Sequence, residues 1–254
     1  MSTTDGRLTK EQLAASSAIF WQGPSPYNGQ PIMAVISGLR KPSDNDKTGH
    51  MAQVDILVAD EHPVEAIKTG ADAAICGGCP LRRNDEGRIC YVNVGFGPSA
   101  KFRAQLAARY IHMEPETVGL ILRERGITAR FGSYGDPAML PFEVVDAVIG
   151  TAGTGWTSYT HQWNEPWFDA RHLQYAMASL DHINTVDKLR SLHPTARYYR
   201  LADSYEGIGS DEVRCPSDKT QRKADGRRQV TCETCLLCGG AGKAAKSVVI
   251  VEGS

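Results

Sequence analysis

The seven cysteines of this chain fall into two tight groups instead of being scattered. The first cysteine group is Cys76, Cys79 and Cys90, and the second cysteine group is Cys215, Cys232, Cys235 and Cys238. An odd number does not suit a disulfide framework, and CxxC spacing in a reducing compartment is typical of metal or redox chemistry. Cysteines that serve as small buried hydrophobic residues are the structural alternative. Because two clusters fit that alternative poorly, the sequence predicts two thiolate-bound metal centres.

The first cysteine group supplies three thiols, with Gly77 and Gly78 inside the CxxC allowing a tight turn. A structural zinc site is closed by four ligands, whereas a catalytic centre keeps one position open. Three thiolates on a four-iron cluster would leave one iron free to bind a small molecule. Zinc completed by His112, His50 or a carboxylate is the alternative.

The second cysteine group has the spacing Cys-x16-Cys-x2-Cys-x2-Cys. Three thiols within seven residues crowd a single tetrahedral zinc, but they suit a 4Fe-4S cluster, in which each cysteine binds a different iron. Zinc is again the alternative. Four ligands leave no vacancy, so we expect a structural or electron-transfer role here.

Basic residues surround the second cysteine group, and only three acidic residues oppose them between Arg214 and Lys246. One explanation is that these cations offset the negative charge of a thiolate-bound cluster. The other is contact with an anionic nucleic acid backbone. The residues predicted for that contact are Lys219, Arg222, Lys223, Arg227 and Arg228.

Short strands alternating with helices are expected to position these groups. Val- and Ile-rich strands are predicted at Pro31–Ser37 and Gln53–Ala59, a helix at Lys10–Phe20, and alternating elements from Thr117 to Ala202. This alternation indicates βαβ units in a parallel sheet, and without a Rossmann glycine fingerprint it favours an α/β fold with a complete or partial (β/α) barrel of the TIM type. We expect residues 1–212 to form this barrel-like domain, with a Cys-rich metal-binding segment, 213–254, packed on it.

Polar residues follow several predicted strands, and active sites of such barrels lie at the carboxyl ends of the strands. The glycine-bearing turn after Phe131 could cradle an anionic or amino-acid-like group. In the segment Trp156–Trp163, alternation would place Tyr159 and His161 on one face. The predicted cofactor-binding residues are Gly132, Ser133, Tyr134, Gly135, Asp136, Tyr159 and Gln162, and the predicted catalytic residues are Cys76, Cys79, Cys90, His161 and Asp136.

Composition narrows the class of protein. The chain has 254 residues, 41% hydrophobic and 22% charged, with a net charge of −1. No apolar run approaches the about 20 residues of a membrane span, and the first residues lack an apolar signal core. We therefore expect a cytoplasmic protein that makes no membrane contact. No P-loop, HExxH or nucleophile elbow is present.

Several segments together resemble a family of bacteriophage gene products of uncharacterised activity. They are DKTGHMAQ at Asp46–Gln53, CGGCP at Cys76–Pro80, CYVNVG at Cys90–Gly95, GSYGDP at Gly132–Pro137, YTHQW at Tyr159–Trp163 and the final CETCLLCGG. That family looks distantly similar to radical S-adenosylmethionine enzymes, which use a partial barrel and a three-cysteine cluster near its mouth. The spacing here is CxxC, ten residues, then Cys, in place of CxxxCxxC.

The resulting hypothesis is a radical S-adenosylmethionine-like iron–sulfur enzyme in the host cytoplasm. It would hold one or two 4Fe-4S clusters, bind S-adenosylmethionine, and act on a small molecule, nucleotide or nucleic acid. The alternative is a non-catalytic zinc or iron–sulfur protein that binds nucleic acid or a host protein, with both centres stapling loops.

Overall fold

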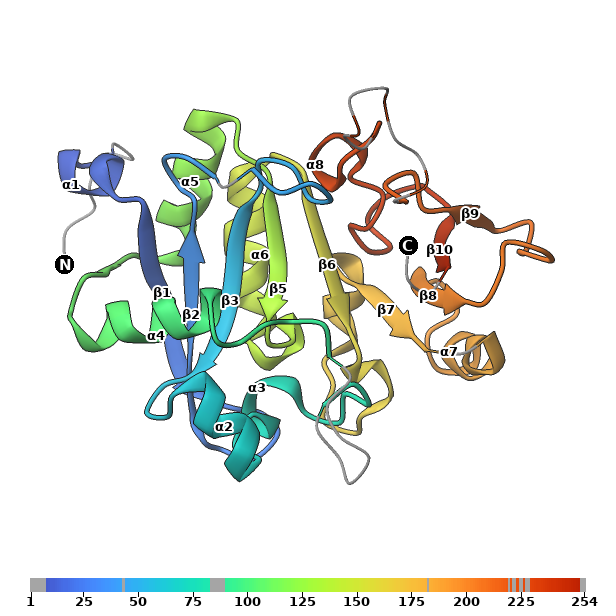
Figure 1. Ribbon diagram of the computed structural model, residues 1–254, viewed down its shortest axis with the longest axis horizontal. Helices are drawn as coiled ribbons and strands as arrows, with labels where there is room; N and C mark the ends of the chain where they lie inside the picture. The colour runs from blue at the N-terminus through green and yellow to red at the C-terminus, as the bar shows by residue number, and fades with distance from the viewer. Residues whose placement is uncertain are drawn as a thin grey trace.

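Ten strands of the described residues form one sheet in the computed structural model (Figure 1). The structure describes residues 8–42, 44–82, 90–181, 183–218, 220, 223, 226 and 229–251. The strands are β1 (Ser17–Pro24), β2 (Pro31–Ser37), β3 (Ala52–Val58), β4 (Ile111–His112), β5 (Ala129–Tyr134), β6 (Trp156–Thr160), β7 (Met177–Leu180), β8 (Tyr198–Ala202), β9 (Glu212–Arg214) and β10 (Ser247–Val251).

Eight α-helices among the described residues connect these strands. They are α1 (Lys10–Ala14), α2 (Pro63–Thr69), α3 (Ala73–Cys76), α4 (Gly97–Leu106), α5 (Pro115–Arg125), α6 (Phe142–Ala152), α7 (Val186–Leu192) and α8 (Cys232–Cys235). Figure 1 shows α4 in front of the β1–β3 part of the sheet and α6 behind β5. None of these helices combines the length and the apolar character that a bilayer crossing needs.

The sheet order is β4-β1-β2-β3-β5-β6-β7-β8-β10-β9. β2 runs antiparallel to β1 and β3, whereas every pair from β3 to β9 is parallel. The predicted α/β class with a mainly parallel sheet is therefore confirmed. The sheet is not closed among the described residues. The C-terminal segment packs on the rest of the chain and also supplies β10, which lies between β8 and β9.

The core explains why the apolar runs became strands. Residues Ile32–Ile36 of β2 are fully buried, as expected for a strand covered on both faces. The helix predicted over Lys10–Phe20 is wrong beyond Ala14, because Ala18, Ile19 and Phe20 are consecutively buried in β1. Three buried neighbours in succession suit a central strand, whereas an amphipathic helix would turn one of them to solvent.

Candidate metal centres

The first cysteine group lies at the carboxyl ends of the parallel strands. Cys76 ends α3, and Gly77 takes a left-handed φ of +50°, which turns the chain toward Cys79. The N–H of Cys79 donates to the carbonyl of Cys76 at 3.1 Å, and the N–H of Cys90 donates to Leu81 at 2.9 Å. These bonds bring Cys90 back beside the CxxC, although residues 83–89 lie outside the described part of the chain.

Burial and neighbouring charge keep the Cys76 thiol protonated. Burial raises its pKa well above the usual value, and Cys79, Asp72, Asp136 and Cys90 raise it further. The three thiols are therefore close enough to interact electrostatically. Since a metal ligand must be a thiolate, a bound cation has to supply the free energy that displaces the proton of Cys76.

Gln162 fastens the CxxC turn to the sheet. Its Nε2 donates to the Cys76 carbonyl at 2.8 Å, and its Oε1 accepts from the N–H of Gly78 at 3.2 Å. A Cβ on Gly77 would come within 2.2 Å of Oε1, so the turn is wrapped closely around this side chain. Gln162 is fully buried beside the first cysteine group, and its predicted binding of a cofactor stays a prediction.

Asp136 is a second buried side chain that holds the CxxC turn in place. Its carboxylate accepts from the N–H of Ala138 at 3.0 Å, the N–H of His161 at 2.8 Å and Gln162 Nε2 at 3.2 Å. Its own N–H donates to Ile75 at 2.7 Å, next to Cys76. The carboxylate thus joins the end of β5, the end of β6 and the CxxC turn.

His161 bridges a thiol and a carboxylate. Its Nδ1 lies 3.5 Å from Cys79 Sγ, and its Nε2 lies 3.6 Å from Asp181 Oδ1, just after β7. Burial opposes protonation, but Asp181 and Cys79 together raise the pKa of His161 to about 10. The charged imidazole can therefore stabilise a thiolate at Cys79. His112, on β4, and His50 contact none of the first-group cysteines in the described part of the structure.

The glycine-bearing turn before Asp136 has a structural part in this site. Gly132 and Gly135 both have left-handed φ values, +75° and +77°. A Cβ on Gly135 would lie 2.8 Å from Ile56 Cβ and 3.3 Å from the Ile75 carbonyl, so this turn packs directly on the first cysteine group's loop. Ser133 Oγ donates to Gln53 Oε1 at 2.6 Å, and Tyr134 is buried. Cofactor binding by these residues stays a prediction.

The second cysteine group converges on one pocket. Cys215, Cys232, Cys235 and Cys238 all line it, together with Lys47, Thr157, Tyr159, Tyr199, Pro216, Ser217, Leu236, Leu237 and Val248. Cys215 extends β9 by donating its N–H to Val249 at 2.8 Å, and Cys238 accepts from Ser158 of β6 at 2.9 Å. Two segments, one at Cys215 and one from Cys232 to Cys238, therefore deliver four thiols to one pocket beside the start of β6.

The loop between β2 and β3 completes this pocket. The N–H of Cys232 donates to the Lys47 carbonyl at 2.9 Å, and Ser217 Oγ donates to the same carbonyl at 3.1 Å. Glu233 accepts from the N–H of His50 at 2.8 Å. No local sequence pattern predicts this contact, because it joins residues 183 positions apart.

Tyr159 belongs to the second cysteine group and not, as predicted, with His161. β6 ends at Thr160, and His161 already has the helical φ and ψ of −91° and −5°, so strand alternation stops before it. Tyr159 hydrogen-bonds Cys238, which lowers the pKa of that thiol, but burial outweighs this and raises it to about 12. Burial likewise raises the pKa of Cys215 to about 11.

The two cysteine groups lie at opposite ends of the parallel strands (Figure 1). In Figure 1 the arrowheads of β3, β5 and β6 point toward α3, whereas α8 lies near the tail of β6. A Cβ on Gly155, just before β6, would come within 2.0 Å of Leu236. The first group therefore occupies the edge where α/β enzymes carry their chemistry, and the second occupies the opposite edge.

No three His, Cys, Asp or Glu side chains of the described residues form a group that could hold a metal ion. That result concerns ligands gathered around one ion, whose sulfur atoms lie about 2.3 Å from it in a zinc site. In a four-iron cluster each thiolate binds a different iron, so its sulfurs need not approach a single point. Four thiols around one pocket suit the cluster in their chemistry and number.

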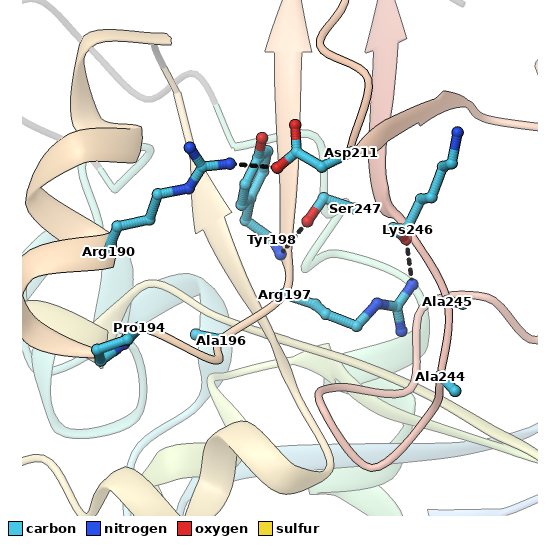
Figure 2. A pocket seen from close by; sticks show the side chains of 10 residues that line it. All are labelled: Arg190, Pro194, Ala196, Arg197, Tyr198, Asp211, Ala244, Ala245, Lys246 and Ser247. Carbon is cyan, nitrogen blue, oxygen red and sulfur yellow. Dashed lines mark hydrogen bonds and ion pairs between the residues drawn. The ribbon is translucent and has the colours of Figure 1, made fainter.

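A second pocket, of about 460 Å³, opens at the starts of β8 and β10 (Figure 2). Arg190 and Asp211 form an ion pair at its rim. Arg197 is buried and donates to the carbonyls of Gly240 and Lys246, which fastens the loop between Cys238 and β10. No cysteine lines this pocket.

The predicted nucleic-acid contact is mostly outside the described part of the chain. Lys219, Arg222, Arg227 and Arg228 lie there, and Lys223 is exposed. No protein-family model matches the chain, and neither a curated protein nor a solved structure is significantly similar to it.

Proposed function

We propose that this protein is an iron–sulfur enzyme with two thiolate-bound clusters. Cys76, Cys79 and Cys90 hold the reactive cluster, and the second cysteine group holds an auxiliary one. The observation that carries the proposal is the convergence of Cys215, Cys232, Cys235 and Cys238 on one pocket. Four free thiols around one pocket, of which Cys215 and Cys238 are buried, would without a metal only add small apolar volume, whereas cluster ligation explains both their number and their spacing.

The position of the first cysteine group supports the reactive role. It lies at the carboxyl ends of β5, β6 and β7, where Asp136, His161 and Asp181 follow the strands. The strands β5 to β8 neighbour each other in chain order, as in a partial (β/α) barrel. A cluster with three thiolate ligands supplies an iron that can bind a small molecule and an electron that can be passed to it.

The residues around the first cysteine group have separate parts in this proposal. Asp136 and Gln162 hold the CxxC turn in shape through the hydrogen bonds described above. His161, charged beside Asp181, donates from Nδ1 to the Cys79 thiolate and so stabilises the bound form. By resemblance, the small molecule is S-adenosylmethionine and the substrate a nucleotide or nucleic acid.

Metal content after oxygen-free purification tests the proposal. We expect a brown protein with about eight irons and eight sulfides per chain, four for each cluster. Cys90→Ala and Cys232→Ala should each retain about four irons, because the two groups share no ligand. His112→Ala, on the remote strand β4, is the control and should retain all of them.

Binding of S-adenosylmethionine is measured on the same samples by equilibrium dialysis. We expect it in the parent protein and in Cys232→Ala, and not in Cys90→Ala. Colourless protein with stoichiometric zinc and no iron after reconstitution contradicts the proposal and favours the zinc-stapled alternative.

A further inference from the structure

The β8–β10 pocket is the cavity of about 460 Å³ at the starts of these two strands (Figure 2). Sites for small organic molecules have volumes of about 300–1,000 Å³, and this pocket falls within that range. Pro194 and Ala196 precede β8 and line one side of it in Figure 2. Ala244 and Ala245 belong to the loop before β10 and line the other side. These small apolar side chains leave room for the body of an organic ligand.

Arg197 places a buried positive charge in the lining of this pocket. Only 7% of the residue is exposed. Its Nη1 donates to the Gly240 carbonyl at 2.9 Å, and its Nη2 donates to the Lys246 carbonyl. Its Nε is buried without an acceptor, and none of the ion pairs among the described residues includes Arg197. Because a buried cation is costly without a negative partner, the pocket favours an anionic ligand.

Ser247 adds a second kind of buried donor to the lining. The residue is 6% exposed, and its Oγ accepts from the N–H of Tyr198 at 3.2 Å. A serine hydroxyl both accepts and donates, so the Ser247 proton is still available for a ligand oxygen. The guanidinium of Arg197 has five N–H groups, and its bonds to the two carbonyls use only two of them. The pocket therefore offers hydrogen-bond donors to a ligand that is rich in acceptors.

The charge of the lining is positive overall. Its cations are Arg190, Arg197 and the exposed Lys246, and its single acidic side chain among the described residues is Asp211. Asp211 is ion-paired with Arg190. Three cations and one carboxylate leave two positive charges, those of Arg197 and Lys246, for a ligand to balance.

We propose that the β8–β10 pocket binds a small phosphate monoester with an organic body of about the size of a sugar. A phosphate monoester carries a charge of about −1.5 to −2 at pH 7 and three acceptor oxygens. It therefore matches both the two unbalanced cations and the unused donors of Arg197 and Ser247, whereas a carboxylate would bring only one charge. The organic body would lie between the apolar walls of the pocket.

This inference does not rest on the proposed function. The pocket opens at the starts of β8 and β10, whereas the first cysteine group lies at the carboxyl ends of the parallel strands. The phosphate ester is therefore a separate ligand and not the molecule that would react at the first cysteine group.

Calorimetric titration of the full-length protein tests the inference, in a buffer of low salt without phosphate. The probes are ribose 5-phosphate, ribose and inorganic phosphate. We expect ribose 5-phosphate to bind, and the other two to bind at least about tenfold more weakly, because each lacks either the charge or the organic body. Hydrogen exchange on the same complex should slow at the amides of residues 244–247, which locates the ligand.

A pair of substitutions at Ala244 separates charge from shape. Ala244 is exposed, so Ala244→Glu adds a carboxylate to the lining without removing a native side-chain contact, and Ala244→Gln adds the same shape without charge. We expect Ala244→Glu to weaken binding of ribose 5-phosphate at least about tenfold, and Ala244→Gln less than about threefold. Arg197 is left intact, because its bonds to Gly240 and Lys246 hold the loop that forms one wall.

A second pair of substitutions removes a cation inside and outside the pocket. Lys246→Gln should weaken binding about fivefold, since one exposed charge contact is lost. Lys188→Gln removes an exposed lysine of α7 that does not line the pocket, and it should leave the affinity unchanged.

Four results overturn the inference. They are no binding of ribose 5-phosphate to the parent, equal affinity for ribose or inorganic phosphate, equal affinities of Ala244→Glu and Ala244→Gln, and binding that leaves exchange at residues 244–247 unchanged. Iron counted on the same samples tests the proposed function separately. Binding to a protein without iron would support this inference while removing the proposed function.

Discussion

Gln162→Leu is the substitution that most directly tests the architecture of the first cysteine group. Leucine matches the buried volume but removes three hydrogen bonds, to the Cys76 carbonyl, the Gly78 N–H and the Asp136 carboxylate. No water can replace them, since Gln162 is fully buried. The CxxC turn would then lose its main tether to β6.

The expected cost follows from these bonds. Two bonds between neutral groups contribute about 1 kcal/mol each, and the bond to the carboxylate about 1.5–3 kcal/mol. Burying leucine in place of an amide returns about 1 kcal/mol. We expect the free energy of unfolding to fall by about 3 kcal/mol, and the melting temperature by about 6–12 °C for a domain of this size.

Urea unfolding at pH 7 measures the loss, and hydrogen exchange at the Gly78 amide locates it. Gln162→Glu is the matched variant, because it keeps an acceptor for Gly78 but places a second carboxyl beside Asp136. The repulsion raises the folded-state pKa of the introduced carboxyl, so its destabilisation should weaken as the pH falls and the group is protonated. A Gln162→Leu protein within about 0.5 kcal/mol of the parent, with Gly78 still protected, refutes the assigned role.

Two further substitutions test the rest of the fold. Glu212 is buried and accepts from Arg200 Nη2 at 2.8 Å, and mainly this bond lowers its pKa to about 2. Because the folded pKa lies below the unfolded one, its contribution is present above about pH 4.5 and lost as the pH falls toward 2. Glu212→Gln should cost about 3–5 kcal/mol at pH 7 and flatten that acid dependence in urea unfolding; equal pH profiles for both proteins would falsify this. Gly119→Ala in α5 should lower the free energy of unfolding. Helix propensity adds about 1 kcal/mol, but overpacking removes about 1–3 kcal/mol, because the new Cβ would lie 2.7 Å from the Val148 carbonyl of α6. A rise in melting temperature would contradict this, because it would show that α5 and α6 can move apart at little cost.

Local patterns predicted the elements whose burial is continuous along the chain. Pro31–Ser37 was expected as a strand and is β2, and strands and helices do alternate from α5 to β8, where alternating elements were expected from Thr117 to Ala202. The prediction of a helix through Phe20 failed because the apolar run Ala18–Phe20 carries no period of its own. Only its partners in the sheet, β2 and β4, decide that it is extended.

The same distinction applies to the candidate sites. Asp136, His161 and Gln162 could be predicted because carboxyl ends of neighbouring parallel strands meet at one edge. Tyr159 was misplaced because alternation was extended one residue past the end of β6.

The arrangement of the two cysteine groups argues against both serving the same purpose. If both only stapled loops, nothing would require one to lie at the carboxyl ends of β5 and β6 among buried polar side chains, which are costly to assemble. A centre that only holds loops together is stabilised by apolar packing, and Met177, Val248 and Ile250 pack in this way around the second group. Asp136 and Gln162 instead hold a CxxC turn open at the edge where parallel sheets bind their ligands. Under the proposed function, chemistry at the first group would account for the free-energy cost of burying these polar side chains there.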